Sequence, residues 1–278
     1  KRSLNIYKKQ LEDFIELNGK NKIYCFSNET LISSSLMFKF RPRPNIWTND
    51  PISIARKLSF FNKLEDLFDK VHIILGLRNQ SSLIKSFYCQ TYRISYRFFR
   101  ETNNFEKFFN YAFLENDYGF FSDALYYDQI VDEYIDLFKK ENVLIYLLEE
   151  LENKEYDRFS GLLAELICCE KGFVKNFLEN NQENETIKYQ NKSISAPRSL
   201  ADYLAHLHGR FSPSLKGRWL QHTFLWKLAR KIKINNNVNV NLNNSNISFI
   251  KDKYKESNLR LMKNLNLDLK KYDYFNKI

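Results

Sequence analysis

The sequence predicts an α/β fold in which helices flank a parallel β-sheet. Three short apolar segments, at residues 22–26, 71–77 and 143–147, have the length and composition of buried strands. Segments with the helical spacing of apolar residues separate them, and this alternation is typical of a parallel sheet with right-handed crossovers. Among the 278 residues there are only 7 glycines and 5 prolines, which favours helices over a turn-rich all-β fold.

The N-terminal elements begin with helical spacing over residues 4–17, followed by the candidate strand at 22–26. The Arg-Pro-Arg-Pro run at 41–44 must be irregular, because each proline removes a hydrogen-bond donor and restrains the residue before it. A second helical pattern at 54–68 leads into the strand at 71–77. We expect both faces of that strand to be covered, because its apolar residues are continuous.

The same order repeats farther along the chain. Residues 123–140 are amphipathic and lead into the apolar strand at 143–147, and helical spacing returns at 159–169. Residues 199–232 are expected to be mainly helical. The asparagine-rich tract at 234–248 leaves two alternatives open, an edge strand through its alternating apolar residues or a segment without regular structure.

Charge is distributed unevenly along the chain. The net charge is +10, and from residue 198 onward there are 16 basic and 5 acidic residues, whereas the first 197 residues carry 27 and 28. A basic surface suits an anionic nucleotide, an acidic glycan, an anionic lipid headgroup or a nucleic acid. The polar segment at 179–192 is expected to link two regions, residues 1–178 and residues 179–278.

The cysteines argue against a metal site. Cys25, Cys89, Cys168 and Cys169 show no C-x-x-C spacing. Cys25 and Cys89 fall in segments expected to be buried, and free buried cysteines suit a reducing cytoplasm. No apolar run reaches about 18 residues, so no transmembrane helix is expected. The sequence therefore predicts a cytoplasmic protein without a bound metal.

The junction that follows the strand at 71–77 is the most informative part of the sequence. Arg78 ends the strand, and polar residues 79–82 supply capping side chains for the next helix. Ligands bind beyond the carboxyl ends of parallel strands, where a helix N-terminus offers N–H groups and a partial positive charge. Ser86 lies eight residues after Arg78, about one and a half turns into the helix. Arg78 and Ser86 therefore predict a phosphate site, although Arg78 could instead pair with a surface carboxylate.

Arg78, Asn79 and Ser86, in the pattern R-N-Q-x5-S-x-Y after a hydrophobic strand, resemble the 3′-phosphate-binding motif of sulfotransferases that use 3′-phosphoadenosine 5′-phosphosulfate (PAPS). The wider segment at 73–92 is similar to bacterial sulfotransferases that act on carbohydrates. Weaker similarities follow the same order as in that group. They lie at residues 23–31, 126–151, 191–195 and 254–261, the last with the pattern Y-x-x-S-N-x-x-L.

The resemblance implies a three-layer, P-loop-NTPase-like α/β fold. Residues 1–178 would form the PAPS-binding core, and the basic, mainly helical residues 179–278 would complete the donor and acceptor site. The implied reaction transfers a sulfuryl group from PAPS to a hydroxyl of a carbohydrate or similar acceptor, without a metal. The family's glycine-rich K-x-G-T-T loop has no counterpart in this chain. Because that loop lies upstream of the matching region in relatives, we expect the core to lack its first βα unit.

The resemblance also suggests further site residues. Glu29 occupies the glutamate of the family's S-x-E segment, where it would act as the general base for the acceptor hydroxyl. A helix-capping or ion-paired carboxylate is the alternative for Glu29. Lys216, Gly217 and Arg218 resemble the S-K-G-R loop that covers the nucleotide in some sulfotransferases, and a solvated basic loop is the alternative there.

Two other functions stay open. The C-terminal region could bind an acidic polymer or a nucleic acid, although no recognised nucleic-acid-binding motif supports the latter. The chain could also be a degenerate, non-catalytic sulfotransferase-fold subunit. The acidic pair Glu149 and Glu150, after the strand at 143–147, is expected to have a structural or substrate-contacting role rather than a catalytic one.

Overall fold

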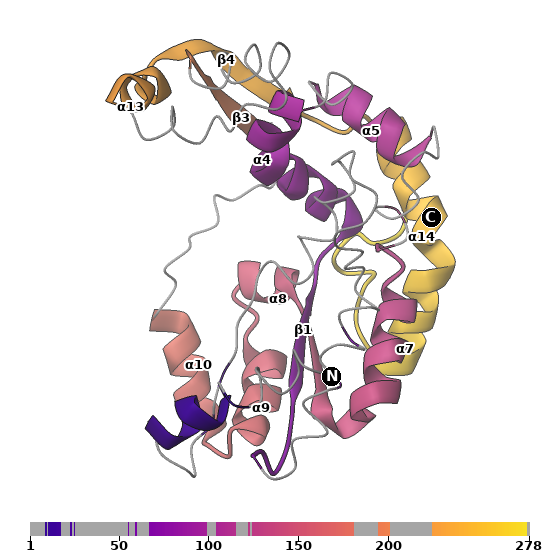
Figure 1. The fold of residues 1–278 in the computed structure, drawn as a ribbon. Helices are drawn as coiled ribbons and strands as arrows, with labels where there is room; N and C mark the ends of the chain where they lie inside the picture. Colours follow the sequence, from indigo (N-terminus) through magenta and orange to yellow (C-terminus); the bar gives the residue numbers. More distant parts are fainter. Residues whose placement is uncertain are drawn as a thin grey trace. The chain divides into compact units, whose positions relative to one another are not determined.

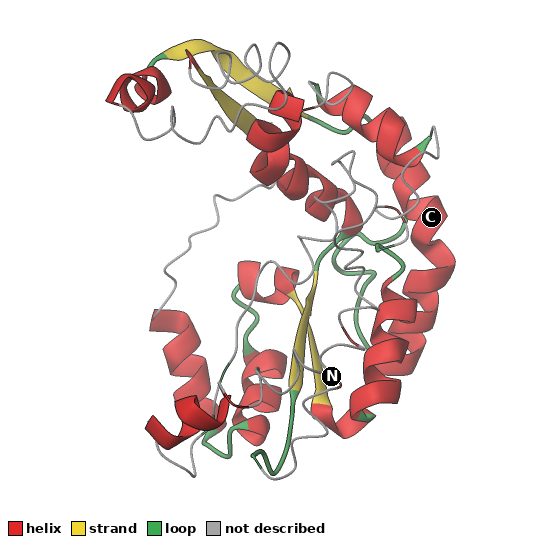
Figure 2. Ribbon diagram, in the orientation of Figure 1, coloured by secondary structure: helices red, strands yellow, loops and turns green. Residues whose placement is uncertain are grey.

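The chain is mixed α/β and mostly helical (Figure 2). The computed structural model describes residues 9, 11–17, 23, 25, 55, 59, 67–98, 104–114, 122, 124–180, 194–200 and 224–276. These belong to two compact units, one comprising 1–32, 49–77 and 129–184, the other 33–48, 78–128 and 185–278. The predicted boundary at residue 178 separates a PAPS-binding core from a region that completes the site, and this division of function stays a prediction.

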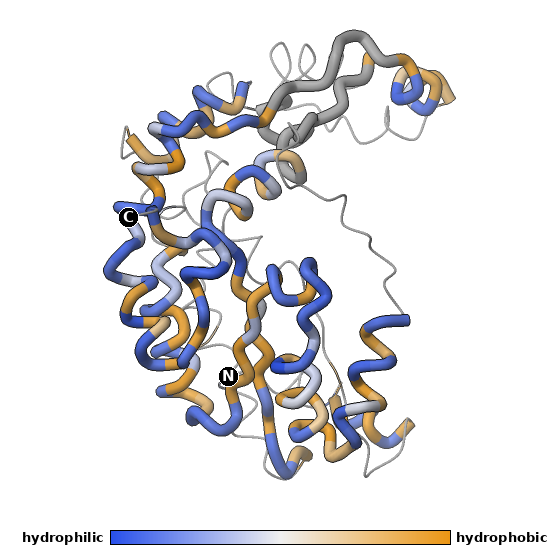
Figure 3. The backbone as a smooth tube through the Cα atoms, turned by 180° about the vertical axis from the view of Figure 1, so that it is seen from behind, coloured by the Kyte–Doolittle hydropathy of each residue, from blue (hydrophilic) through white to orange (hydrophobic). Residues whose placement is uncertain are grey.

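The first unit contains a two-stranded parallel sheet (Figure 1). Strand β1 (Ile73–Leu77) pairs with β2 (Val143–Leu147), and Leu77 lies opposite Leu147. Helix α7 (Tyr127–Phe138) precedes β2, as parallel pairing requires a long crossover. Both strands and their parallel orientation are as the sequence predicts. Their residues are mainly hydrophobic (Figure 3).

Gly76 is required by the close approach of Tyr146, its partner across the two strands. A Cβ atom at position 76 would lie 2.6 Å from the Tyr146 hydroxyl oxygen and 2.7 Å from its Cζ. The Tyr146 ring also packs on Phe159 of α9 (Asp157–Leu166), with ring centroids 4.6 Å apart. Glycine therefore lets the tyrosine ring cross β1, and burial raises the pKa of Tyr146.

The expected burial of β1 on both faces is wrong. Leu75 and Leu77 are buried, but Ile74 is 43% exposed and Gly76 is also exposed. Alternating burial of this kind marks one covered face. A continuous apolar run does not distinguish one covered face from two, because both tolerate the same residue types.

The expected strand at 22–26 is not supported where it can be checked. Ile23 and Cys25, its two described residues, lie outside any strand and are exposed. The remaining residues of this segment lie outside the described part of the chain. An apolar run forms a buried strand only where a neighbour completes its backbone hydrogen bonds, so the burial expected for Cys25 is wrong.

The helices of the first unit follow the prediction in part. Residues 9 and 11–17 are helical, within the helix expected at 4–17, and most of 54–68 lies outside the described residues. Helix α9 overlaps the pattern at 159–169. Two further helices, α8 (Leu148–Glu152) and α10 (Lys171–Asn180), were not predicted.

The second unit contains three longer helices held together by aromatic rings. They are α4 (Gln80–Phe98), α5 (Phe105–Phe113) and α14 (Asn244–Leu265). Tyr88 of α4 lies 5.1 Å from Phe108 of α5, centroid to centroid. Such ring pairs stabilise helix packing beyond the apolar area that they bury. A further edge-to-face pair, 6.2 Å apart, joins α5 to α14 through Phe109 and Phe249.

The second unit also contains an antiparallel pair of strands and a short helix. Strand β3 (Ile194–Ser199) pairs antiparallel with β4 (Lys233–Val240), and α13 (Phe224–Lys231) precedes β4. The edge-strand alternative is therefore confirmed for residues 234–240 of the asparagine-rich tract, whereas residues 244–248 belong to α14. The tract also supplies Asn243, whose side chain accepts a hydrogen bond from the Asn246 N–H at 2.7 Å and caps α14. Residues 201–223, expected to be mainly helical, lie outside the described residues.

Candidate anion site

The start of α4 is fixed by an asparagine cap. Asn79 accepts a hydrogen bond at its Oδ1 from the Ser82 N–H at 3.3 Å, and at its carbonyl oxygen from the Leu83 N–H at 2.8 Å. The predicted capping role is confirmed for Asn79, and the helix begins at Gln80. No acidic residue occupies the first turn, so the partial positive charge of the helix N-terminus is not offset there.

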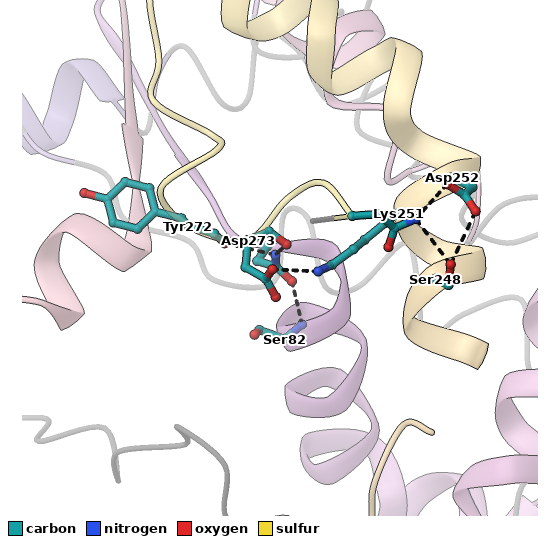
Figure 4. Close-up of polar contacts among 8 residues, drawn as sticks. Ser82, Ser248, Lys251, Asp252, Tyr272 and Asp273 are labelled. Atoms are coloured by element: carbon teal, nitrogen blue, oxygen red, sulfur yellow. Dashed lines mark hydrogen bonds and ion pairs between the residues drawn. The ribbon is translucent and has the colours of Figure 1, made fainter. Parts of the chain in front are cut away.

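Asn79 also ties α4 to the C-terminal segment. Its Nδ2 donates to the carbonyl oxygens of Tyr272 at 3.2 Å and Asp273 at 2.9 Å. Lys251, buried on α14, donates from Nζ to the Asp273 carboxylate at 2.7 Å (Figure 4). The Asn79 side chain therefore binds the backbone of α4 through its oxygen and the backbone of residues 272–273 through its nitrogen.

Gln80 connects two of the segments that resemble sulfotransferase motifs. Its Nε2 donates to Asn258 Oδ1 at 2.8 Å, and Asn258 Nδ2 donates back to Gln80 Oε1 at 3.4 Å. Both side chains are buried, and the residues are 178 positions apart in the chain. The segments R-N-Q and Y-x-x-S-N-x-x-L thus meet through a reciprocal amide pair.

The rest of the Y-x-x-S-N-x-x-L segment anchors α14 to the start of α7. Tyr254 donates from its hydroxyl to the Ser122 carbonyl oxygen at 2.9 Å. Ser257 donates to one oxygen of the buried Asp128 carboxylate, and Arg260 Nε donates to the other at 2.6 Å. Tyr254, Ser257 and Asp128 are buried, and together with Asn79, Gln80 and Asn258 they are called the buried frame below. The place of Tyr254 and Ser257 in the motif therefore has a structural explanation.

The first turns of α4 carry further polar residues, of which Ser86 belongs to the motif. At about 100° per residue, Ser81, Lys85 and Cys89 follow one line, with Ser82 and Ser86 beside it. Lys85 and Ser86 are half-buried, and Ser81 is buried. The Ser81 hydroxyl makes no hydrogen bond within the described residues. On this projection Ser82 lies between Lys85 and Ser86, which point about 100° apart because they are adjacent in the helix.

Lys85 is a candidate site residue that the sequence analysis missed. Burial, and then the positive charge of Arg78, lower the pKa of Lys85, which indicates that the two cations lie within electrostatic range. Two neighbouring cations attract an anion more strongly than either does alone. The sequence feature that could have identified Lys85 is its position, seven residues after Arg78 and directly before Ser86.

Cys89, one turn beyond Lys85, is not a nucleophile at neutral pH. Burial raises the pKa of the Cys89 thiol to about 11, against a smaller lowering by Lys85. The thiol therefore stays protonated, and the thiolate is the reactive form. The positive charge of Lys85 near Cys89 is therefore not enough to activate the sulfur.

Glu150, the second residue of the acidic pair after β2, has the structural role that was one of the two roles expected for the pair. Glu150 is buried and receives hydrogen bonds from Arg158 Nε and Nη2, each at 2.7 Å. Arg158 Nη1 also donates to the Ile145 carbonyl oxygen at 3.0 Å, and the Leu147 N–H donates to Glu150 at 3.4 Å. Both charged groups are engaged locally in stabilising the end of β2.

The other predicted site residues, Glu29, Lys216, Gly217 and Arg218, lie outside the described residues, so their roles stay predictions. Within the described ranges, no three His, Cys, Asp or Glu side chains gather as a metal site would require. No helix in those ranges combines the length and hydropathy needed to cross a bilayer.

Comparisons with protein-family models, with curated proteins and with solved structures find no match to this chain. The resemblance to PAPS-dependent sulfotransferases therefore rests on the motif residues themselves. Of these, Asn79, Gln80 and Asn258 belong to the buried frame, whereas Arg78 and Ser86 belong to the candidate anion site, to which the electrostatics add Lys85.

Proposed function

We propose that the protein is a PAPS-dependent sulfotransferase with a P-loop-like α/β fold, and that Arg78, Lys85 and Ser86 bind the 3′-phosphate of the donor. One observation carries the proposal. The R-N-Q-x5-S pattern follows a strand directly, and its arginine lies within electrostatic range of Lys85, the residue before Ser86 on the capped helix.

The chemistry of these side chains suits a phosphate dianion. The Arg78 guanidinium can donate two parallel hydrogen bonds to phosphate oxygens, while Lys85 adds a compact charge and Ser86 a hydroxyl donor. The helix N-terminus contributes a further partial positive charge. Phosphate binding would also raise the lowered pKa of Lys85, because an anion stabilises the ammonium form.

Holding the 3′-phosphate would orient the whole donor. In the proposed reaction the acceptor hydroxyl oxygen attacks the sulfur, the bond from sulfur to the 5′-phosphate oxygen breaks, and 3′-phosphoadenosine 5′-phosphate (PAP) leaves. Such transfer depends mainly on in-line positioning and on charge stabilisation of the leaving group. Glu29 is proposed to take the hydroxyl proton, and a carbohydrate is the proposed acceptor.

The buried frame favours a precisely positioned site. Asn79 and Gln80 directly follow Arg78 in sequence, and each is hydrogen-bonded to a distant part of the second unit. The Tyr127 hydroxyl also donates to the Arg78 carbonyl oxygen at 2.7 Å. Backbone restraints of this kind reduce the conformational freedom that binding would otherwise have to remove.

Thermal unfolding of the full-length protein with PAP and with 5′-AMP tests the proposal, since AMP lacks the 3′-phosphate. A ligand that binds only the folded state raises the Tm with its concentration. We expect PAP to raise the Tm more than AMP does, and Arg78→Ala to remove the difference. Lys255→Ala, an exposed change on α14, is the control and should preserve it. An equal response to PAP and AMP in the unmodified protein would refute the 3′-phosphate site.

A transfer assay separates catalysis from donor binding. With PAPS and a hydroxyl-bearing glycan, the unmodified protein should form a sulfated product. Glu29→Gln should remove product formation while the response to PAP persists. PAP binding without transfer to any acceptor would favour the degenerate, non-catalytic subunit over the enzyme.

A further inference from the structure

Helix α13 leaves large apolar side chains uncovered. Phe224 is 76% exposed and Leu225 is 74% exposed, and Leu228 and Ile232 are nearly half exposed. At about 100° per residue, these four positions share one side of the helix and its immediate continuation. Monomeric proteins rarely leave such a group of large apolar residues in water without a binding role.

A second side of α13 attaches the helix to its own unit. Trp226 and Ala229 are buried and pack with Leu200, which follows β3. The Leu200 N–H also donates to the Ile232 carbonyl oxygen at 2.8 Å. The helix is therefore anchored through one side, and the exposed apolar side is not the one that packs on the protein.

The third side of α13 is entirely basic. Lys227, Arg230 and Lys231 are exposed, and Lys231 lies next to the apolar side on the helical projection. Figure 3 shows hydrophobic and hydrophilic residues alternating along this helix. Residues 203–251 contain eight basic residues and no acidic residue, so the positive charge extends well beyond α13.

We infer that α13 binds the surface of an anionic phospholipid bilayer. The apolar side chains enter the boundary between headgroups and acyl chains, while the three cations contact lipid phosphates. Amphipathic helices with Lys and Arg beside large apolar residues bind membranes in this way. This inference is independent of the sulfotransferase proposal.

The charges and the apolar residues together select the bilayer over other partners. A nucleic acid offers phosphates but would leave the aliphatic side chains in water. A second copy of the chain packed on the apolar side would bring three further cations near these three, which is unfavourable. An anionic bilayer satisfies both sides of the helix at once and requires no complementary groove.

Flotation of the full-length protein with vesicles tests the inference. We expect binding to phosphatidylcholine vesicles that contain phosphatidylglycerol, little binding to phosphatidylcholine alone, and release by salt. The combined change Lys227→Glu, Arg230→Glu, Lys231→Glu should lower the partition coefficient roughly a hundredfold, at about fivefold for each cation lost. The matched control Lys255→Glu, Lys263→Glu, Lys270→Glu on and after α14 alters net charge equally and should lower it far less.

A second variant tests the apolar contribution without changing charge. Phe224→Ser, Leu225→Ser, Leu228→Ser should reduce binding by more than roughly tenfold, and it should retain the circular dichroism and Tm of the unmodified protein because these residues are exposed. Equal losses in both charge variants, or binding that survives the serine changes, would overturn the inference. Self-association that the serine changes abolish, with no vesicle binding, would identify a second copy as the partner and would also overturn it.

Discussion

The strand-to-helix junctions after β1 and after β2 differ in how their charges are used. After β2, Glu150 and Arg158 lie 2.7 Å apart, and each also contacts the backbone at the end of the strand. After β1, Lys251 pairs with Asp273 beside the Asn79 cap, and the described influence on Lys85 is that of Arg78, between two like charges. The junction after β2 pairs its two charges with each other, whereas the junction after β1 brings two like charges into electrostatic range.

This difference separates stabilising residues from candidate binding residues. A carboxylate held by a forked arginine has its hydrogen bonds within the protein, so it has little left to offer a ligand. Two cations near a helix N-terminus gain from an added anion. At the α4 junction the described side-chain hydrogen bonds that fix the helix start come from the neutral amides Asn79 and Gln80.

The largest effect is expected from breaking the charge pair after β2. Arg158→Ala leaves the buried Glu150 carboxylate without its cation, so we expect a loss of about 3 kcal/mol in the free energy of unfolding. Urea denaturation measures it. Lys175→Ala, which breaks the exposed pair with Asp157, should cost much less. Equal costs for the two changes would mean that the Glu150–Arg158 pair contributes no more than a surface contact.

A smaller loss is expected at the amide pair of the α4 junction. Gln80→Leu leaves buried polar atoms of Asn258 without their partner, which costs about 2 kcal/mol. Asn258→Leu should cost a similar amount. The double change should cost clearly less than the sum, because no buried amide then lacks its partner. Strictly additive losses in this double-mutant cycle would contradict the reciprocal pair.

Removing the charge of Lys85 should weaken the anion site without destabilising the frame. Lys85→Met keeps the half-buried stem, and we expect roughly tenfold weaker PAP binding, equivalent to about 1.4 kcal/mol. Calorimetric titration measures the change. Affinity for PAP in the unmodified protein should also fall as pH rises through the lowered pKa of Lys85. An affinity that does not respond to either change would exclude Lys85 from the site.

The smallest effect concerns thiol reactivity. With its pKa raised to about 11, Cys89 should react with iodoacetamide ever faster as the pH increases toward that value. The exposed Cys168 is the internal comparison, and peptide mass spectrometry distinguishes the two. At pH 8 Cys89 should be labelled more slowly than Cys168. A labelling rate for Cys89 that levels off near pH 9 would show that burial does not control this thiol.

Local patterns in the sequence predict the elements that surround the candidate site. Strand β2 begins where predicted because its apolar run follows the polar residues 139–142, and Asn79 caps α4 because its short side chain reaches the backbone of the first turn. Lys85 could have been recognised from its spacing to Arg78. Attention to the family's motif positions alone passed over this residue.

Contacts between distant residues could not be predicted in the same way. Nothing local indicates that Gln80 would pair with Asn258, because each amide has many possible partners until the helices pack. The same holds for Asp128 with Arg260. Burial of an apolar segment also depends on which element covers it, and this is why Cys25 is exposed despite its apolar neighbours.

The central claim is that the Arg78 and Lys85 cations recognise a 3′-phosphate. Calorimetric titration of the full-length protein should give a Kd for PAP at least about tenfold lower than that for 5′-AMP, as expected for a phosphate held by charged groups. In Arg78→Ala combined with Lys85→Met, the two affinities should become nearly equal. A preference for PAP that persists in the double variant would contradict the claim.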